Sequence, residues 1–332
     1  MSVASATRDF TGAASTCPEQ GSDGTGPSVH ADSGTAKCGS REATLGNDTA
    51  CESQPVAGPR GFIGFEWPEC SGPTLTVGLG ARADFQSIAE AIRHAEPMSR
   101  VLVWPGIYHE SITLDKPLEI VGAGHGGLPV IATSRTPSVV LVKGAATLRG
   151  VTLHYTGGDA RGAAVIEQDG LRMLGCRVVC SANAAVAVNA GASVLLERTR
   201  VRNEWHGGCG ISIGRGGSCG IIGSVVAAPR CVVHADPGCS VLIEWSRLLP
   251  GLCGIYIARP DPSAPAERAT TGCTIDESEI DGASVAGIFV GGGSHHRADH
   301  VLIRQCKGNG VVVARGADLA MVDCRILCAG RS

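Results

Sequence analysis

The octapeptides Val194-Leu-Leu-Glu-Arg-Thr-Arg-Val201 and Val241-Leu-Ile-Glu-Trp-Ser-Arg-Leu248 are two copies of one pattern. Each copy has aliphatic residues at its first, third and eighth positions and a small hydroxyl residue at its sixth. We call the eighth position the anchor, and the pattern recurs with the anchors Leu153, Val178, Val201, Val226, Leu248, Ile280, Gly308 and Ile326. Successive anchors differ by 25, 23, 25, 22, 32, 28 and 18 residues. A period in the low twenties is typical of a β-solenoid.

Within the pattern, inward-pointing and outward-pointing side chains alternate in two short runs, as they do along β-strands. The alternation slips by one residue between the runs, at Glu197-Arg198, Glu244-Trp245 and Asp276-Glu277, so the backbone is expected to turn a corner there. A third apolar run follows in most repeats, for example Gly254-Ile-Tyr-Ile257. The sequence therefore predicts an all-β fold, a single-stranded parallel β-helix with three strands per coil and about 8–10 coils. The handedness rule for parallel connections favours the right-handed form.

The composition argues against several classes of function. A net charge of −3, without a basic or aromatic platform, argues against nucleic acid as a partner. No apolar run approaches the roughly 20 residues that cross a bilayer, and the first ten residues do not resemble a secretory signal. We therefore expect a cytoplasmic protein that binds neither nucleic acid nor a membrane.

The chain has 15 cysteines, and eight of them lie at or beside inferred interior positions. The odd number and these positions favour small buried thiols in a reducing compartment. Cys176 and Cys180 share one register with Cys324 and Cys328, which leaves a metal site as the alternative. The repeat alone already explains Cys176 and Cys324, so we predict no structural metal and no cofactor.

The first 58 residues differ from the rest of the chain. They are rich in Ser, Thr, Gly, Ala and Asp, with scarcely any large apolar residue, and such a segment is predicted to be disordered. Residues 59–332 are predicted to form the β-helix domain. A helix is expected over about residues 85–95, with Asp84 as its N-cap, covering the open end of the core. Its apolar face consists of Phe85, Ile88, Ala91, Ile92 and Ala95.

Four segments near the start of the domain resemble a known family: Thr74–Val77, Asp84–Ile92, Val101–Glu110 and Ile112–Gly124. They look like the first coils of the pectin-lyase-like right-handed parallel β-helix superfamily, and the resemblance covers about residues 74–328. The chain is most similar to the intracellular β-helix repeat domains, of carbohydrate-binding or sugar-hydrolase type, of F-box adaptors and of the SH2-domain-binding protein of the Shc adaptor. Its similarity to pectin methylesterases is weaker. The resemblance implies a β-helix that presents a long surface to a partner.

The methylesterase branch also implies a set of catalytic residues. Those enzymes carry a Gln beside an Ala-Val-Ala-type strand, an Asp in each of the next two coils, and an Arg before Pro-Trp. Here Gly162 precedes the strand Ala163–Ile166, and the next two regions, residues 181–184 and 209–213, contain no carboxylate. That chemistry needs one Asp as nucleophile and another as acid and base. We therefore predict no catalytic residues of this kind.

Three other motifs suggest chemistry. His295, His296 and His300 follow three glycines and are candidate metal ligands, with an exposed polar loop as the alternative. Gly210-Ile-Ser-Ile-Gly214 matches the nucleophile-elbow pattern, but Ser212 is expected in the middle of a strand. An acidic group suits calcium, and it consists of Asp276, Glu277, Glu279 and Asp281. The adjacent coils, however, supply no second group of carboxylates.

The residue before each anchor is expected to point outward. These residues are Thr152, Arg177, Arg200, Val225, Arg247, Glu279, Lys307 and Arg325. Stacked coils place such side chains about 4.8 Å apart, with Arg177 and Arg200 on adjacent coils and Trp245 near Arg247. A long face of this kind suits an acidic peptide or an anionic glycan. The alternative is a solvated sheet face, where arginine opposes aggregation.

Two functions of different class follow. The first is a non-catalytic recognition module that binds a protein partner, or an anionic ligand such as a glycan, along a sheet face. Its candidate binding residues are Arg177, Arg200, Arg247 and Trp245. The second is a divergent carbohydrate-active enzyme, a lyase or esterase, in which the insertion Arg259–Thr271 forms a cleft wall beside Tyr256 and Glu244. Carboxylates converging near that insertion favour the enzyme, and a flat face of mixed charge favours the binder.

Overall fold

The computed structural model describes residue 67 and residues 69–80, 82–124, 126–158, 160–259, 272–293 and 295–328. The chain divides into two compact units, Met1–Ala57 and Gly58–Ser332, and every described residue belongs to the second. The segment predicted to be disordered, residues 1–58, lies outside the described residues.

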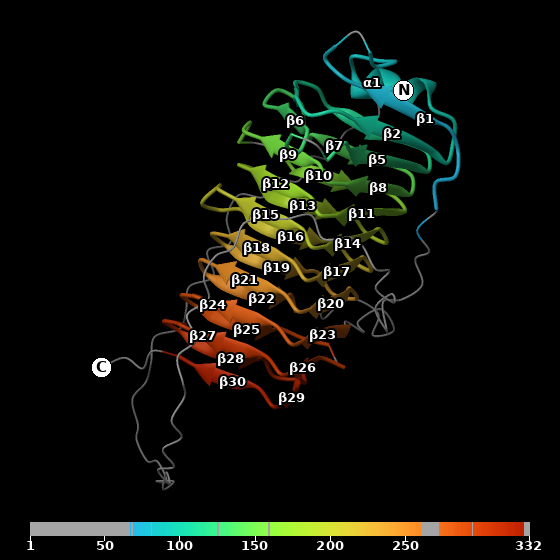
Figure 1. Cartoon of the computed structure of the whole chain (residues 1–332). Helices are drawn as coiled ribbons and strands as arrows, with labels where there is room; N and C mark the ends of the chain where they lie inside the picture. Colours follow the sequence, from blue (N-terminus) through green and yellow to red (C-terminus); the bar gives the residue numbers. More distant parts are fainter. Residues whose placement is uncertain are drawn as a thin grey trace, which may run out of the picture. The chain divides into compact units, whose positions relative to one another are not determined.

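The described chain winds through three parallel sheets, which we call A, B and C (Figure 1). Sheet A contains β1 (Thr74–Val77), β2 (Ser99–Val103), β5 (Leu118–Gly122), β8 (Ala146–Arg149), β11 (Gly170–Leu174), β14 (Ser193–Glu197), β17 (Ser218–Ile222), β20 (Ser240–Glu244), β23 (Gly272–Asp276), β26 (Arg297–Asp299) and β29 (Ala320–Val322). Sheet B contains β3 (Ile107–Tyr108), β6 (Val130–Thr133), β9 (Thr152–Tyr155), β12 (Arg177–Cys180), β15 (Arg200–Asn203), β18 (Val225–Ala228), β21 (Arg247–Pro250), β24 (Glu279–Asp281), β27 (Leu302–Arg304) and β30 (Arg325–Leu327). Sheet C contains β4 (Ile112–Leu114), β7 (Val140–Val142), β10 (Gly162–Ile166), β13 (Ala184–Val188), β16 (Cys209–Ile213), β19 (Cys231–Ala235), β22 (Cys253–Ile257), β25 (Ala286–Val290) and β28 (Asn309–Val313).

The stacked core confirms the predicted right-handed parallel β-helix. Met173 pairs with Leu196, Leu196 with Ile221, and Ile221 with Ile243, so all four side chains lie in one file on sheet A. Each is 0% exposed. Because every coil adds one side chain to each interior file, the aliphatic core runs the length of the solenoid.

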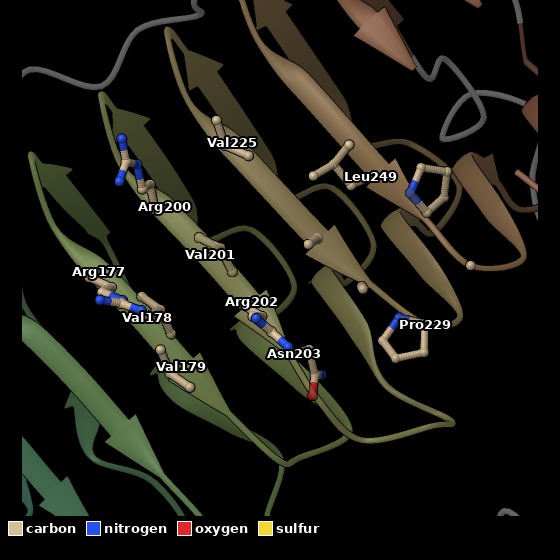
Figure 2. A pocket seen from close by; sticks show the side chains of 14 residues that line it. Arg177, Val178, Val179, Arg200, Val201, Arg202, Asn203, Val225, Pro229 and Leu249 are labelled. Carbon is tan, nitrogen blue, oxygen red and sulfur yellow. The ribbon is translucent and has the colours of Figure 1, made fainter. Parts of the chain in front are cut away.

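Outward files on sheet B keep the same register. Arg177 pairs with Arg200, Arg200 with Val225, and Val225 with Arg247. Figure 2 shows the first three of these residues on successive strands of sheet B. The predicted placement of two arginines on adjacent coils, with the third two coils further on, is therefore confirmed.

The corner between sheets A and B lies where the alternation of the sequence slips. Arg198, Trp245 and Glu277 have φ values of 48°, 47° and 45°, in the left-handed region, and the equivalent positions of two other coils are the glycines Gly175 and Gly223. A left-handed residue turns the backbone sharply without continuing either strand. The parity slip in the sequence thus marks the corner residue itself.

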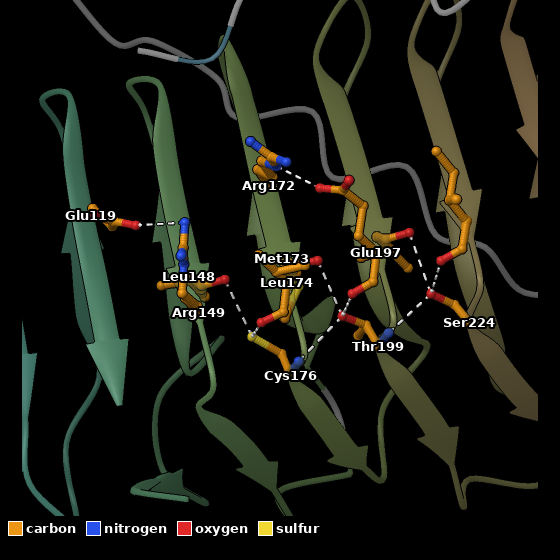
Figure 3. Close-up of polar contacts among 12 residues, drawn as sticks. Glu119, Leu148, Arg149, Arg172, Met173, Leu174, Cys176, Glu197, Thr199 and Ser224 are labelled. Atoms are coloured by element: carbon orange, nitrogen blue, oxygen red, sulfur yellow. Dashed lines mark hydrogen bonds and ion pairs between the residues drawn. The ribbon is translucent and has the colours of Figure 1, made fainter. Parts of the chain in front are cut away.

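A ladder of hydroxyl groups stabilises this corner (Figure 3). The backbone N–H of Thr199 donates to Oγ of Ser224, that of Ser224 to Oγ of Ser246, and that of Ser246 to Oγ of Ser278, at 3.0–3.1 Å. These side chains are all buried. Because a buried N–H without a partner is costly, the recurring small hydroxyl residue two positions before the anchor satisfies the backbone of the coil before it.

One coil has a different register from the one that the sequence suggested. Ala298 pairs with Ile275, and Ile303 pairs with Ile280, so the anchor is Ile303 and not Gly308. The outward residue before it is Leu302, not Lys307, and the last three anchors are evenly spaced. The prediction was wrong because the first interior position of this coil holds His296, which is 2% exposed, and an imidazole was not expected in the core.

The N-terminal helix α1 (Ile88–His94) is shorter than predicted, and its cap is a different residue. Ser87 is the N-cap and its side chain accepts from the Glu90 N–H, whereas Asp84 accepts from the backbone and hydroxyl of Thr76. The Glu110 carboxylate also accepts hydrogen bonds at the first turn of the helix. The helix packs against β1, β2 and β4, and Figure 1 places it at the N-terminal end of the coil stack, as expected.

The described cysteines are all free, and nine of them are buried: Cys176, Cys180, Cys209, Cys219, Cys231, Cys239, Cys253, Cys273 and Cys306. Burial raises the pKa of Cys176 to about 11 and that of Cys273 to about 12. Such thiols stay protonated at neutral pH and pack as small apolar groups. Within the described part of the chain, no helix is long and apolar enough to cross a membrane.

Candidate functional site: the outer face of sheet B

A hollow of about 540 Å³ lies on the outer face of sheet B, across β12, β15, β18 and β21 (Figure 2). Its floor is aliphatic and half-buried, made by Val179, Val225, Ala227 and Leu249. Arg177, Arg200 and Arg202 also line it, and Pro229 and Pro250 lie at the end where the strands leave the sheet. We call this the arginine hollow.

The charged side chains that line the arginine hollow are all positive. None of its lining residues is a carboxylate. Among the described residues, no carboxylate lies within ion-pair distance of Arg177 or Arg200, while Arg202 contacts Glu204 at 3.2 Å across largely exposed side chains. Like charges at paired positions on adjacent strands repel each other. Two guanidinium groups on paired strands therefore leave an excess of positive charge that an external anion would neutralise.

Several arginines elsewhere on the solenoid are paired with carboxylates. On sheet A, Glu119 contacts Arg100 at 2.8 Å and Arg149 at 3.2 Å, and Arg172 binds Glu197 on the next coil (Figure 3). Glu119 is only 6% exposed, which shows how closely these side chains cover it. In each of these pairs the arginine has a carboxylate on the adjacent strand, as expected of an ion pair that stabilises a sheet. Arg177 and Arg200 lack that arrangement.

Arg247, the third predicted binding arginine, is paired in this way. It contacts Glu279 at 3.4 Å and Asp281 at 2.7 Å, and Arg304 contacts the same two carboxylates. These four alternating charges satisfy one another on β21, β24 and β27. Arg247 does not line the arginine hollow, so the structure brings together only two of the three arginines that the sequence proposed for binding.

Trp245 occupies a second depression, of about 490 Å³, at the corner between sheets A and B. Its side chain is 55% exposed, and its indole N–H donates to Glu277 at 2.6 Å. His300 lines the same depression and hydrogen-bonds Asp276 at 3.2 Å, which raises the pKa of the imidazole. Burial, helped by the charge of Asp276, raises the pKa of the nearby Glu244. This corner site combines an aromatic ring, carboxylates and an imidazole.

The three candidate metal-binding histidines do not share a site. His295 is exposed, His296 is inside the core with Nε2 3.1 Å from the Gly292 carbonyl, and His300 is at the corner depression. The expectation of one exposed polar loop was therefore wrong for His296. Among the described residues, no group of three or more metal-ligating side chains is gathered.

Burial of His296 predicts a pH-dependent stability. Desolvation lowers the pKa of His296 in the folded chain below the usual value near 6.5, and its Nδ1 has no partner. The unfolded chain thus binds the proton more readily, so stability is lost as the pH falls below about 6.5. We expect the free energy of unfolding to decline less between pH 7 and pH 5 in His296→Leu than in the wild type. The exposed neighbour offers the control, because His295→Asn should leave the decline unchanged; equal declines in all three proteins would contradict the assignment.

The strands of sheet C that contain residues 163–166, 184–188 and 209–213 present an outward file without a carboxylate. Its outward file on β10, β13 and β16 consists of Val165, Ala187 and Ser212, and Ser212 lies in mid-strand as expected. The same file continues as a stack of His234, Tyr256 and Phe289 with ring centroids 5.2 and 4.9 Å apart. These residues are half-buried and make an apolar surface, with no carboxylate in the file.

The cleft proposed beside the insertion is only partly described. Residues 260–271 of the insertion lie outside the described residues. Tyr256 lies on β22 of sheet C, and Glu244 ends β20 of sheet A, at the corner that leads to sheet B. The carboxylates that do converge, near Trp245 and His300, are at that corner, whereas the insertion joins sheet C to sheet A.

Sequence reasoning missed three of the four floor residues of the arginine hollow, and its third arginine. It followed only the outward residue before each anchor, whereas Val179, Arg202, Ala227 and Leu249 stand one residue after the anchor. Strand alternation makes that second position outward as well. The signal was present in three apolar residues, Val179, Ala227 and Leu249, of an outward file where polar residues would be expected.

Among the comparisons with known proteins, the one with solved structures supports the fold. No protein-family model matches the sequence, and no curated protein matches it significantly. Pectate lyase Pel9A is 14% identical, with a TM-score of 0.52 over 76% of this chain and 82% of that chain. Rhamnogalacturonan lyase is 12% identical, with a TM-score of 0.50 over 77% and 87%. The pectin methylesterase from Aspergillus niger is 16% identical, with a TM-score of 0.45 over 81% and 88%. The likeness to the two lyases shows a shared right-handed β-helix fold.

Proposed function

We propose that the protein is a non-catalytic recognition module whose arginine hollow binds an acidic segment of a partner protein. The observation that carries this proposal is the pair of unneutralised arginines, Arg177 and Arg200, beside an aliphatic floor. Charge-assisted hydrogen bonds from guanidinium groups recognise carboxylates with directional specificity. The aliphatic floor suits an apolar side chain next to the acidic one.

Two further features favour the binding of a peptide at this site. No group lining the hollow can act as an acid or base at neutral pH, because its polar side chains are arginines and one asparagine. The hollow also has no aromatic ring, the flat apolar surface on which a stacked ligand would rest. The resemblance of residues 74–328 to the β-helix repeat domains of F-box and Shc-binding adaptors is consistent with a protein partner.

A charge-reversal experiment tests this function. The probe is a fluorescein-labelled peptide of alternating glutamate and leucine, and binding is measured by anisotropy. We expect Arg177→Glu with Arg200→Glu to weaken the affinity by at least about tenfold, roughly the contribution of one hydrogen bond to a charged group. Binding should also weaken as salt is added.

Arg325→Glu is the matched control. Arg325 is exposed in the same outward file of sheet B, on the last coil, and does not line the hollow. Its replacement should leave the affinity unchanged. Equal binding by the wild type and the double variant would remove the proposal, provided that both unfold at the same temperature.

A second candidate function is a divergent carbohydrate-active enzyme, and the corner depression favours it. There an exposed Trp245, the carboxylate of Glu277 and the Asp276-bound imidazole of His300 lie close together. Acid–base cleavage of a sugar chain needs groups of these types. The test is the release of reducing or unsaturated ends from polygalacturonate, rhamnogalacturonan and alginate. Cleavage that is lost in Glu277→Gln would support the enzyme, and no cleavage of any of the three would count against it.

A further inference from the structure

We infer that the anion bound in the arginine hollow is a phosphoryl group on a partner peptide, a dianion and not a single carboxylate. This inference rests on the proposed function and specifies the chemistry of the ligand. It comes from three features of the hollow: the amount of its positive charge, the spacing of its guanidinium groups and the nature of its floor.

The charge of the hollow exceeds what one carboxylate neutralises. Arg177 and Arg200 bring two full positive charges without a described counter-ion, and Arg202 adds a third that Glu204 only partly offsets. The outward neighbours of this pair along the file are Thr152 and Val225, which carry no charge. A phosphorylated side chain carries a charge of about −1.5 to −2 at pH 7, which matches the isolated pair.

The spacing of the two arginines suits a group with several acceptor oxygens. Their strands are adjacent and in register, so the backbones are about 4.8 Å apart. Two guanidinium groups that start from neighbouring strands can converge on one anion, because the side chains are long and exposed. A phosphoryl group offers three acceptor oxygens and can accept from both guanidinium groups at once, whereas a carboxylate offers two oxygens.

The floor favours a peptide as the carrier of the phosphoryl group. Val179, Val225, Ala227 and Leu249 form an aliphatic surface beside the arginines, and no aromatic ring lines the hollow. A nucleotide base would find no ring on which to stack. An aliphatic residue next to a phosphorylated residue would bury apolar surface there, and this contact would add affinity to the charge pairing.

The experiment compares three peptides of one sequence, in which the residue between two leucines is serine, phosphoserine or glutamate. At pH 7.5 we expect the phosphoserine peptide to bind at least about tenfold more tightly than the glutamate peptide, and the serine peptide not to bind. The advantage should shrink toward pH 5, because the phosphate becomes a monoanion below its second pKa near 6 while arginine stays charged. Inorganic phosphate, but not acetate, should displace the phosphoserine peptide.

Variants assign the effect to the hollow. Arg177→Gln with Arg200→Gln should abolish the advantage of phosphoserine, and Arg325→Gln should not alter it. If the glutamate peptide binds as tightly as the phosphoserine peptide and both depend on the two arginines, the phosphoryl inference is overturned while the proposed function stands. If neither peptide depends on Arg177 and Arg200, both are overturned.

Discussion

Replacing Leu196 with alanine should lower the free energy of unfolding by about 2–5 kcal/mol. Leu196 is 0% exposed and lies in the interior file of sheet A between Met173 and Ile221. A shorter side chain would leave a cavity that the neighbouring coils cannot close, because each of them is held in register by strands on three sheets. Denaturation by guanidinium chloride, followed by circular dichroism, measures the loss.

Ile222→Ala is the control for this variant. Ile222 stands on the next strand of sheet A but is partly exposed and points away from the interior file. Its truncation should cost well under half as much, since a partly exposed side chain leaves no enclosed cavity. Equal losses in the two variants would contradict the stacked core.

Ser246→Ala should destabilise the protein by about 1–3 kcal/mol, the cost of a buried polar group without a partner. The Ser246 hydroxyl accepts from the backbone N–H of Ser224 at 3.1 Å and donates to the Glu244 carbonyl at 2.7 Å. Alanine removes both bonds and leaves the Ser224 N–H buried and unpaired. Thermal unfolding measures the effect, and Ser212→Ala, at a partly exposed serine in mid-strand of β16, should have little effect. A loss as small as that of the control would mean that the hydroxyl ladder does not stabilise the corner.

The sequence allowed the fold to be predicted because a solenoid repeats its constraints. Each coil must place aliphatic residues in the same interior files, so equivalent residues such as Leu196 and Ile243 show the period in the sequence alone. The parity slip at Glu244-Trp245 located the corner, because a change of face without a turn would expose the core. The small residue directly after the corner is visible as part of the pattern, but its hydrogen bond to the backbone of the neighbouring coil is not.

The errors have physical causes. His296 broke the apolar pattern of its coil, and a search for aliphatic residues therefore shifted the anchor from Ile303 to Gly308. In the structure the polar ring is accommodated by one hydrogen bond to the Gly292 carbonyl, a local compensation that no pattern of hydrophobicity reveals. The helix is capped by Ser87 and not by the predicted Asp84, because the Asp84 carboxylate accepts hydrogen bonds from Thr76 instead.

The candidate site was only partly predictable for a similar reason. Stacking alone placed Arg177 and Arg200 on adjacent coils, since register follows from the period. Whether an arginine is free or paired depends on the side chains of the neighbouring coils. Arg247 faces Glu279 on the next strand and is neutralised there, whereas Arg200 faces Val225. The selection of a binding site among equivalent outward arginines is therefore a matter of three-dimensional context.

Methyl-detected NMR of the protein with the glutamate–leucine peptide tests the central claim most directly. The account predicts that the methyl resonances of Val179, Val225 and Leu249 in the floor of the hollow shift as the peptide is added. Those of Leu252 and Val285, exposed aliphatic residues outside it, should stay in place. Shifts confined to other surfaces, with the floor resonances unmoved, would contradict binding in the arginine hollow.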